Sequence, residues 1–146
     1  MPGSVFVDTN VLVYERDAFS ADKQARAHLW LAHLWETRTG RISFQVLNEF
    51  YWTVTQKLVP GMDRESARRD VRALMAWQPV PIGSATLERS WVTQERHQLA
   101  FWDSLIVAAA QEAECRYLLT EDLQHGQQLG DLRVMSPFES NPEDLD

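Results

Sequence analysis

The chain has 146 residues, of which 45% are hydrophobic and 24% charged, an ordinary composition for a globular domain that can bury a core. No apolar run approaches the roughly 20 residues that cross a bilayer. The first four residues also lack the basic start of a signal peptide, so we expect a cytoplasmic protein without a membrane partner. Cys115 is the only cysteine, which excludes a disulfide framework and a cysteine-based zinc site.

The formal net charge of −7 argues against a nucleic-acid binder, because affinity for phosphate comes mainly from Lys and Arg. Four of the negative charges, however, lie after Pro137, and removing them leaves −3. If some of the remaining acidic side chains bind metal ions, part of their negative charge is neutralised as well. We expect one domain over residues 1–136 and an acidic, flexible tail over residues 137–146.

Strand-like and helix-like segments alternate along the chain, which is typical of an α/β domain with a parallel sheet. The first half begins with a strand at residues 5–7 and a helix that starts near residue 10. A second helix follows from its cap at Ser20 to about residue 37 and is closed by Gly40. We then predict a strand at 41–43 and a helix at 44–58, which ends before Pro60.

In the second half, Asp63 caps a helix that extends to about residue 77, and two prolines allow only a short extended piece at 79–82. Ser84 caps a helix to about residue 98. The segment 102–115 is apolar on most sides and is therefore expected to be a central helix. Buried strands are predicted at residues 117–120 and 132–135.

Four acidic sites occupy comparable positions in this pattern. Asp8 and Asp122 each follow a predicted strand, where open α/β sheets place their ligands. Asp103 lies near the start of a helix, where a carboxylate is favoured by the free N–H groups. Glu49 lies within an apolar helix, where an acid is costly unless it is paired. The four carboxylates could therefore meet at one end of the sheet.

Each acid also has a structural explanation when it is considered alone. Asp8 can form a turn or cap with Thr9 and Asn10, Asp103 can cap a helix, and Asp122 can belong to a turn. Glu49 is the hardest to explain in this way. Together, two carboxylates 4 Å apart repel by roughly 4 kcal/mol at an effective dielectric of 20. A group of them needs a counter-charge, and an all-oxygen set favours Mg²⁺ or Mn²⁺ over zinc. Such a site suits hydrolysis of a phosphodiester.

Four segments in this order resemble the PIN domain, a nuclease fold. They are VFVDTNVL at 5–12, QVLNEF at 45–50, FWDSLI at 101–106 and LLTEDL at 118–123. The resemblance covers about residues 4–136, and the compact length is similar to that of VapC-like toxins of bacterial toxin–antitoxin modules. It implies a three-layer α/β/α sandwich with a short central parallel sheet, a homodimer and a cognate antitoxin.

The resemblance also implies a site and a reaction. Asp8, Glu49, Asp103 and Asp122 would be catalytic metal ligands, with Thr9, Ser104 and Glu121 as supporting residues. Glu121 and Asp122 compete for the fourth position, and the usual Thr-x-Asp form of this loop favours Asp122. The implied activity is Mg²⁺-dependent endoribonuclease cleavage of RNA by an activated water, which leaves a 5′-phosphate and a 3′-hydroxyl.

Two surfaces beyond the acids are candidates for binding. Arg64, Arg68 and Arg72 recur every four residues and could follow RNA phosphates, although interleaved acids also suit a solvated, salt-bridged face. Three consecutive aromatics at residues 50–52 cannot all face one core, because successive helical residues turn by about 100°. With the tryptophans of the preceding helix they suggest a groove for an antitoxin helix, with candidates Trp30, Trp35 and Tyr51.

Two other functions remain open. A phosphotransfer or phosphatase domain also places an aspartate after its first strand, but usually needs a second one two residues later, where this chain has Asn10. It also needs a loop lysine, and the chain has only Lys23 and Lys57. The other alternative is a non-catalytic member of the same fold that binds RNA or protein.

Overall fold

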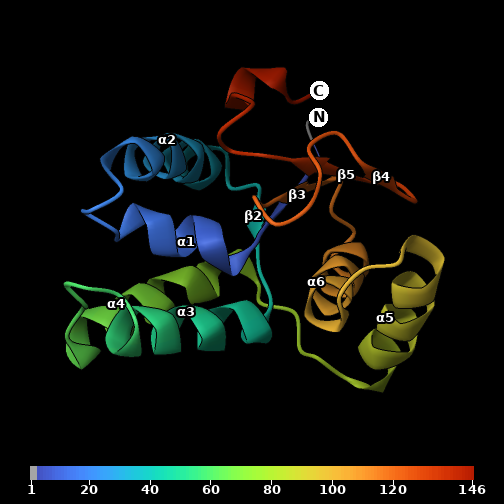
Figure 1. Ribbon diagram of the computed structural model, residues 1–146, viewed down its shortest axis with the longest axis horizontal. Coiled ribbons are helices and arrows are strands. Elements are labelled where there is room, and N and C mark those ends of the chain that lie inside the picture. Colours follow the sequence, from blue (N-terminus) through green and yellow to red (C-terminus); the bar gives the residue numbers. More distant parts are fainter. Residues whose placement is uncertain (1–2) are drawn as a thin grey trace.

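A five-stranded sheet forms the centre of the computed structural model, which describes residues 3–146 (Figure 1). The strands lie in the order β2-β1-β3-β5-β4, and every pairing is parallel except that of β4 with β5. Their bounds are β1 Val5–Val7, β2 Gly40–Arg41, β3 Tyr117–Leu119, β4 Gln128–Leu129 and β5 Leu132–Met135. The chain has the expected PIN-like α/β fold.

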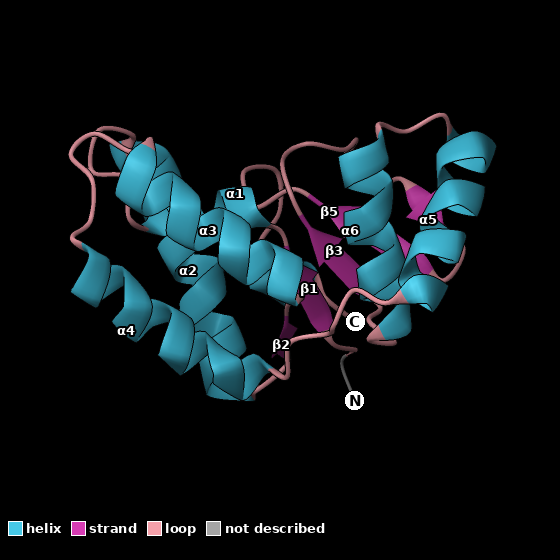
Figure 2. Cartoon of the chain, turned by 90° about the horizontal axis from the view of Figure 1, so that it is seen from below, coloured by secondary structure: helices cyan, strands magenta, loops and turns pink. Residues whose placement is uncertain are grey.

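Six α-helices flank the sheet, with α1 to α4 on one side and α5 and α6 on the other (Figure 2). They are α1 Thr9–Glu15, α2 Ala21–Thr37, α3 Phe44–Gln56, α4 Arg64–Leu74, α5 Ser84–His97 and α6 Phe101–Glu112. Short 3₁₀ helices follow at Met75–Trp77 and Pro142–Asp144. Over residues 3–146, no helix combines the length and apolar character that crossing a membrane requires.

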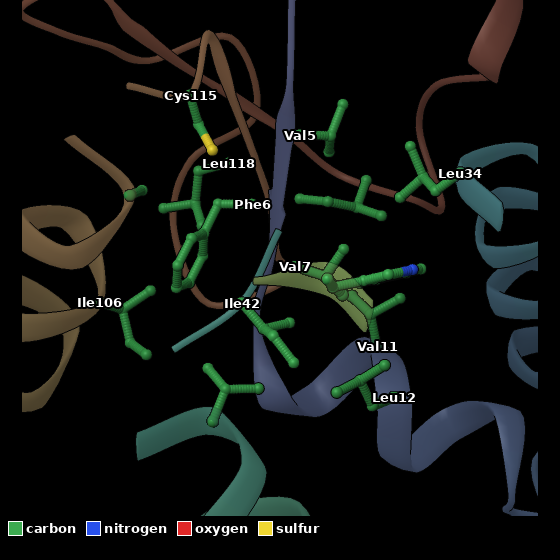
Figure 3. Packing of buried hydrophobic residues seen from close by; sticks show 14 of the residues in the cluster. Val5, Phe6, Val7, Val11, Leu12, Leu34, Ile42, Ile106, Cys115 and Leu118 are labelled. Atoms are coloured by element: carbon green, nitrogen blue, oxygen red, sulfur yellow. The ribbon is translucent and has the colours of Figure 1, made fainter. Parts of the chain in front are cut away.

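The core lies on both faces of β1, whose three residues are all buried. Successive side chains of a strand point to opposite faces, and Figure 3 shows Phe6 directed toward Ile106 of α6 while Val5 points toward Leu34 of α2. A fully buried central strand of this kind explains the continuous apolar run in the sequence. It also fixes Asp8, the next residue, at the carboxyl edge of the sheet.

Most predicted elements are present, but several boundaries were wrong. Helix α2 ends at Thr37, as predicted, but its C-cap is Arg38, which adopts a left-handed φ of 61°, and Gly40 instead begins β2. A Cβ at Gly40 would lie 2.8 Å from ring carbons of Trp77, so close packing rather than helix termination requires glycine there. Ser43 is the N-cap of α3 and not a strand residue. The N-cap of α5 is Gly83, with Ser84 as its first helical residue.

Strand β4 was not predicted from the sequence. It has two residues and pairs only with β5, to which Gly130 at a φ of 64° connects it. A pattern of alternating residues cannot be recognised over two positions.

The segment 137–146, for which flexibility was expected, lies against α2 and β3. The indole N–H of Trp30 donates to the Ser140 carbonyl at 3.1 Å, and the Asp146 N–H donates to the Tyr117 hydroxyl at 3.1 Å. Leu145 packs against the core. These contacts place the segment, and its flexibility stays a prediction.

Candidate metal and active site

A cavity of about 790 Å³ opens beside the carboxyl ends of β1 and β3. The parallel pairing of Val7 with Leu119 brings the residues that follow both strands to this edge of the sheet. Helices α1, α3 and α6 contribute most of the remaining walls. The cavity is lined by carboxylates from four separate parts of the chain, namely Asp8, Glu49, Asp103 and Asp122.

Asp8 is held at the base of the cavity by neutral donors. Its Oδ1 accepts the Thr9 N–H at 2.7 Å as the cap of α1, and its Oδ2 accepts the Thr120 hydroxyl at 2.8 Å. Only 6% of Asp8 is exposed. Burial, with smaller contributions from the charges of Asp122 and Glu49, raises the pKa of Asp8 from 3.8 to about 7 despite these hydrogen bonds.

Glu49 and Asp103 approach from the two helical layers. The Thr9 hydroxyl donates to Glu49 Oε1 at 2.8 Å, which connects α1 with α3. Asp103 lies in the first turn of α6, where the free N–H groups of a helix favour a carboxylate. Burial, followed by the charges of Asp122 and Glu49, raises the pKa of Asp103. The charges of Asp122 and Glu49 therefore act on both Asp8 and Asp103.

Asn10 and Thr120 connect Asp8 with Asp122, and the sequence analysis did not assign them to the site. The Asn10 amide donates to Asp122 at 3.1 Å and to the Thr120 hydroxyl oxygen at 3.2 Å. The same oxygen accepts the Asp122 N–H at 3.0 Å. Their positions in the sequence could have indicated this role. Asn10 lies two residues from Asp8 after β1, and Thr120 lies two residues from Asp122 after β3.

Two of the predicted supporting residues point elsewhere. Glu121 accepts the Tyr14 hydroxyl at 2.6 Å and pairs with Lys23 at 3.3 Å, and it does not line the cavity. Ser104 is fully buried and donates to the Ala100 carbonyl of its own helix at 3.0 Å. Of the two adjacent acids, it is Asp122 that faces the other carboxylates.

The donors around the cavity suit a divalent cation that keeps part of its water shell. Over residues 3–146, no three His, Cys, Asp or Glu side chains come close enough to hold a single ion together. Mg²⁺, however, is usually bound by one or two carboxylates and keeps several waters. Asn10 and Gln45 also line the cavity, and among the described residues their side-chain oxygens, Asn10 Oδ1 and Gln45 Oε1, are buried without a hydrogen-bond partner. With buried Asp8, these oxygens fit a hard cation with a partly aqueous shell.

The arginine stripe of α4 does not line this cavity. Arg72 pairs with Glu65 at 3.1 Å, and Arg68 donates to the Tyr51 hydroxyl at 3.2 Å. Arg64 is exposed. These contacts match the salt-bridged alternative for part of the stripe, and an RNA-binding role stays a prediction.

The three candidate groove residues do not share one surface. Trp30 is fully buried within the hydrophobic core, so it cannot line an open groove. Trp35 is half exposed and lies against Trp77, with ring centroids 4.9 Å apart. Tyr51 faces Arg68 on α4.

Several solved structures share the fold of this chain. A toxin–antitoxin complex from Klebsiella pneumoniae is 22% identical at a TM-score of 0.66, covering 94% of this chain and 100% of that one. FitAB bound to the IR36 DNA fragment is 18% identical at a TM-score of 0.70, covering 94% and 97%. VapC20 of Mycobacterium tuberculosis, described as a sarcin–ricin loop cleaving toxin, is 18% identical at a TM-score of 0.57, covering 79% and 87%.

At this level of identity, the three structures show a shared fold. No curated protein matches the chain significantly. The model of the PIN domain family matches residues 5–127, which is most of the chain and includes all four carboxylates. The chain therefore belongs to the PIN domain family.

Proposed function

We propose that this protein is a divalent-metal-dependent endoribonuclease and the toxin of a cytoplasmic toxin–antitoxin pair. The observation that carries the proposal is the convergence of four carboxylates on one cavity. Among residues 3–146, no Lys, Arg or His forms a salt bridge with any of these four. A group of acids without a protein counter-charge is a site for a cation.

Asp8, Glu49, Asp103 and Asp122 would hold Mg²⁺ or Mn²⁺, one or two of them directly and the others through bound waters. When bound, such an ion supplies a Lewis acid and activates water for attack on a phosphodiester. The protein's own residues orient the ligands. Thr9 connects Asp8 with Glu49, and Asn10 with Thr120 fixes Asp122, so the cavity is arranged before substrate binds.

The toxin assignment is supported by the structural neighbours, which include a toxin–antitoxin complex and a toxin described as cleaving the sarcin–ricin loop. A cognate antitoxin and a homodimer are part of the same proposal. The aspartyl-phosphate and non-catalytic alternatives predict other outcomes, namely a trapped phosphate on Asp8 and no cleavage at all.

The test is cleavage of a mixed RNA pool with Mg²⁺, with EDTA, and by the variants Asp8→Asn and Asp103→Asn. Glu121→Gln is the matched control, because Glu121 is an acid of the same region that faces away from the cavity. We expect 5′-phosphate products from the wild type and the control only. Cleavage retained in both aspartate variants, or in EDTA, would refute the assigned site.

A further inference from the structure

Two large aromatic side chains border the carboxylate cavity and are left in water. Trp52 of α3 is 53% exposed and Trp102 of α6 is 63% exposed, and both line the cavity. An indole ring offers a large flat apolar face. Exposed apolar groups that gather at one place mark a binding surface.

The chain places each tryptophan beside a carboxylate. Trp52 follows Glu49 by three residues, so both lie on the same face of α3. Trp102 immediately precedes Asp103 in the first turn of α6. Because α3 and α6 belong to different helical layers (Figure 2), the cavity has one indole on each side.

The charges around the cavity leave little attraction for phosphate. Among its lining residues within 3–146, Lys57 is the only Lys or Arg, against five acids: Asp8, Asp17, Glu49, Asp103 and Asp122. The Lys57 ammonium lies 5.1 Å from the centre of the Trp52 ring. A nucleic acid must therefore gain much of its affinity here from contacts other than phosphate pairing.

We propose that Trp52 and Trp102 are stacking platforms for unpaired bases, so that the substrate is a single-stranded RNA segment. This inference rests on the proposed nuclease function. Bases within a duplex stack on each other and cannot present their faces to a protein, whereas bases of a single strand can. Lys57 supplies one positive charge at the first platform.

The test measures binding of a labelled, unstructured RNA oligonucleotide in EDTA, where cleavage does not contribute, by fluorescence anisotropy. Trp52→Leu and Trp102→Leu should each weaken binding by about five- to 150-fold, the range for loss of one base–aromatic stack. Phe in place of either tryptophan should retain most of the affinity, because it keeps a ring. Trp91→Leu is the matched control, since Trp91 is 49% exposed on α5 and does not line the cavity.

A fully paired RNA hairpin should bind the wild type at least tenfold more weakly than the single strand. Salt dependence should be shallow, and Lys57→Gln should reduce the slope of log K against log salt by about 0.7, the value for one phosphate contact on a single strand. Leu variants that bind like the wild type, or equal affinity for the hairpin, would overturn the proposal.

The two proposals fail in different ways. If RNA is cleaved with Mg²⁺ but the tryptophan variants bind and cleave normally, the platforms are refuted while the nuclease stands. If single strands bind through both tryptophans but no Mg²⁺-dependent cleavage occurs, the nuclease is refuted while the binding surface stands. Variants that weaken only the antitoxin complex would assign the surface to the protein partner and overturn the stacking role.

Discussion

Neutralising Asp8 should stabilise the metal-free protein, although Asp8 is the central residue of the proposed site. The pKa of Asp8 is 3.8 in an unfolded chain and about 7 in the folded one. Between these values the folded state binds a proton that the unfolded state has released. The free energy of unfolding therefore falls as pH rises from about 4 to 7 and is fully reduced above pH 7.

The magnitude follows from the two pKa values. Each pKa unit corresponds to about 1.36 kcal/mol, so the full cost of ionised Asp8 is roughly 4 kcal/mol, and about 2–3 kcal/mol of it develops between pH 5 and pH 8. Asp8→Asn removes this dependence. In the variant, the amide NH₂ group that replaces Oδ2 cannot accept the Thr120 hydroxyl. The lost hydrogen bond destabilises the variant by about 1–2 kcal/mol, which offsets part of the gain in stability.

The assay is urea denaturation of wild type and Asp8→Asn in EDTA at pH 5 and pH 8. The stability of the variant relative to wild type should increase by about 2–3 kcal/mol between the two pH values. Excess Mg²⁺ should stabilise the wild type at pH 8, by about 2.7 kcal/mol at 100 times its Kd, and leave the variant nearly unchanged. A relative stability that is independent of pH would refute the buried, ionisable Asp8 described above.

Three other predictions concern single side chains. Asp122→Asn should reduce the steady-state rate of RNA cleavage by more than the 10–100-fold typical of losing an outer-shell partner. Glu121→Gln should leave this rate within about threefold of wild type. Comparable losses in the two variants would contradict the placement of Glu121 against Tyr14 and Lys23. Thr120→Val should lower the free energy of unfolding at pH 8 by about 1–3 kcal/mol and raise the pKa of Asp8 further, which NMR titration can follow. The Cys115 thiol, whose pKa burial raises to about 12, should resist a thiol reagent at pH 8 until urea unfolds the protein.

The convergence of four carboxylates on one cavity could be predicted because each acid has a local signal, which for Glu49 is its place in an apolar helix. Their role as metal ligands stays a prediction. Asp8 and Asp122 follow apolar runs that form strands, and Asp103 begins a strongly apolar helix. Parallel pairing of β1 with β3 then brings strand ends together without any further information. The existence of the fold and the meeting of the acids therefore depend on short-range patterns.

The partners of individual side chains could not be predicted in this way. Glu121 and Asp122 are adjacent in the sequence, yet the partners of Glu121, Tyr14 and Lys23, lie 107 and 98 residues away from it. Trp30 likewise has a partner that is distant in the sequence. The helical pattern placed it on α2, but it could not reveal that its indole N–H donates to the Ser140 carbonyl, 110 residues away. Such pairings depend on how loops and termini lie, which periodicity does not record.

The neutral donors of the site explain how an acidic cavity can exist and still be open to a cation. An Arg or Lys beside Asp8 would interact with it by roughly 4 kcal/mol at 4 Å and a dielectric of 20, and a metal ion would have to displace it. Asn10, Thr9 and Thr120 instead hold the carboxylates with uncharged hydrogen bonds. They fix the geometry but leave the charge uncompensated, and burial of Asp8 is the main reason why its pKa rises to about 7. The repulsion among the four converging carboxylates therefore remains uncompensated in the metal-free protein, and a bound cation would relieve it.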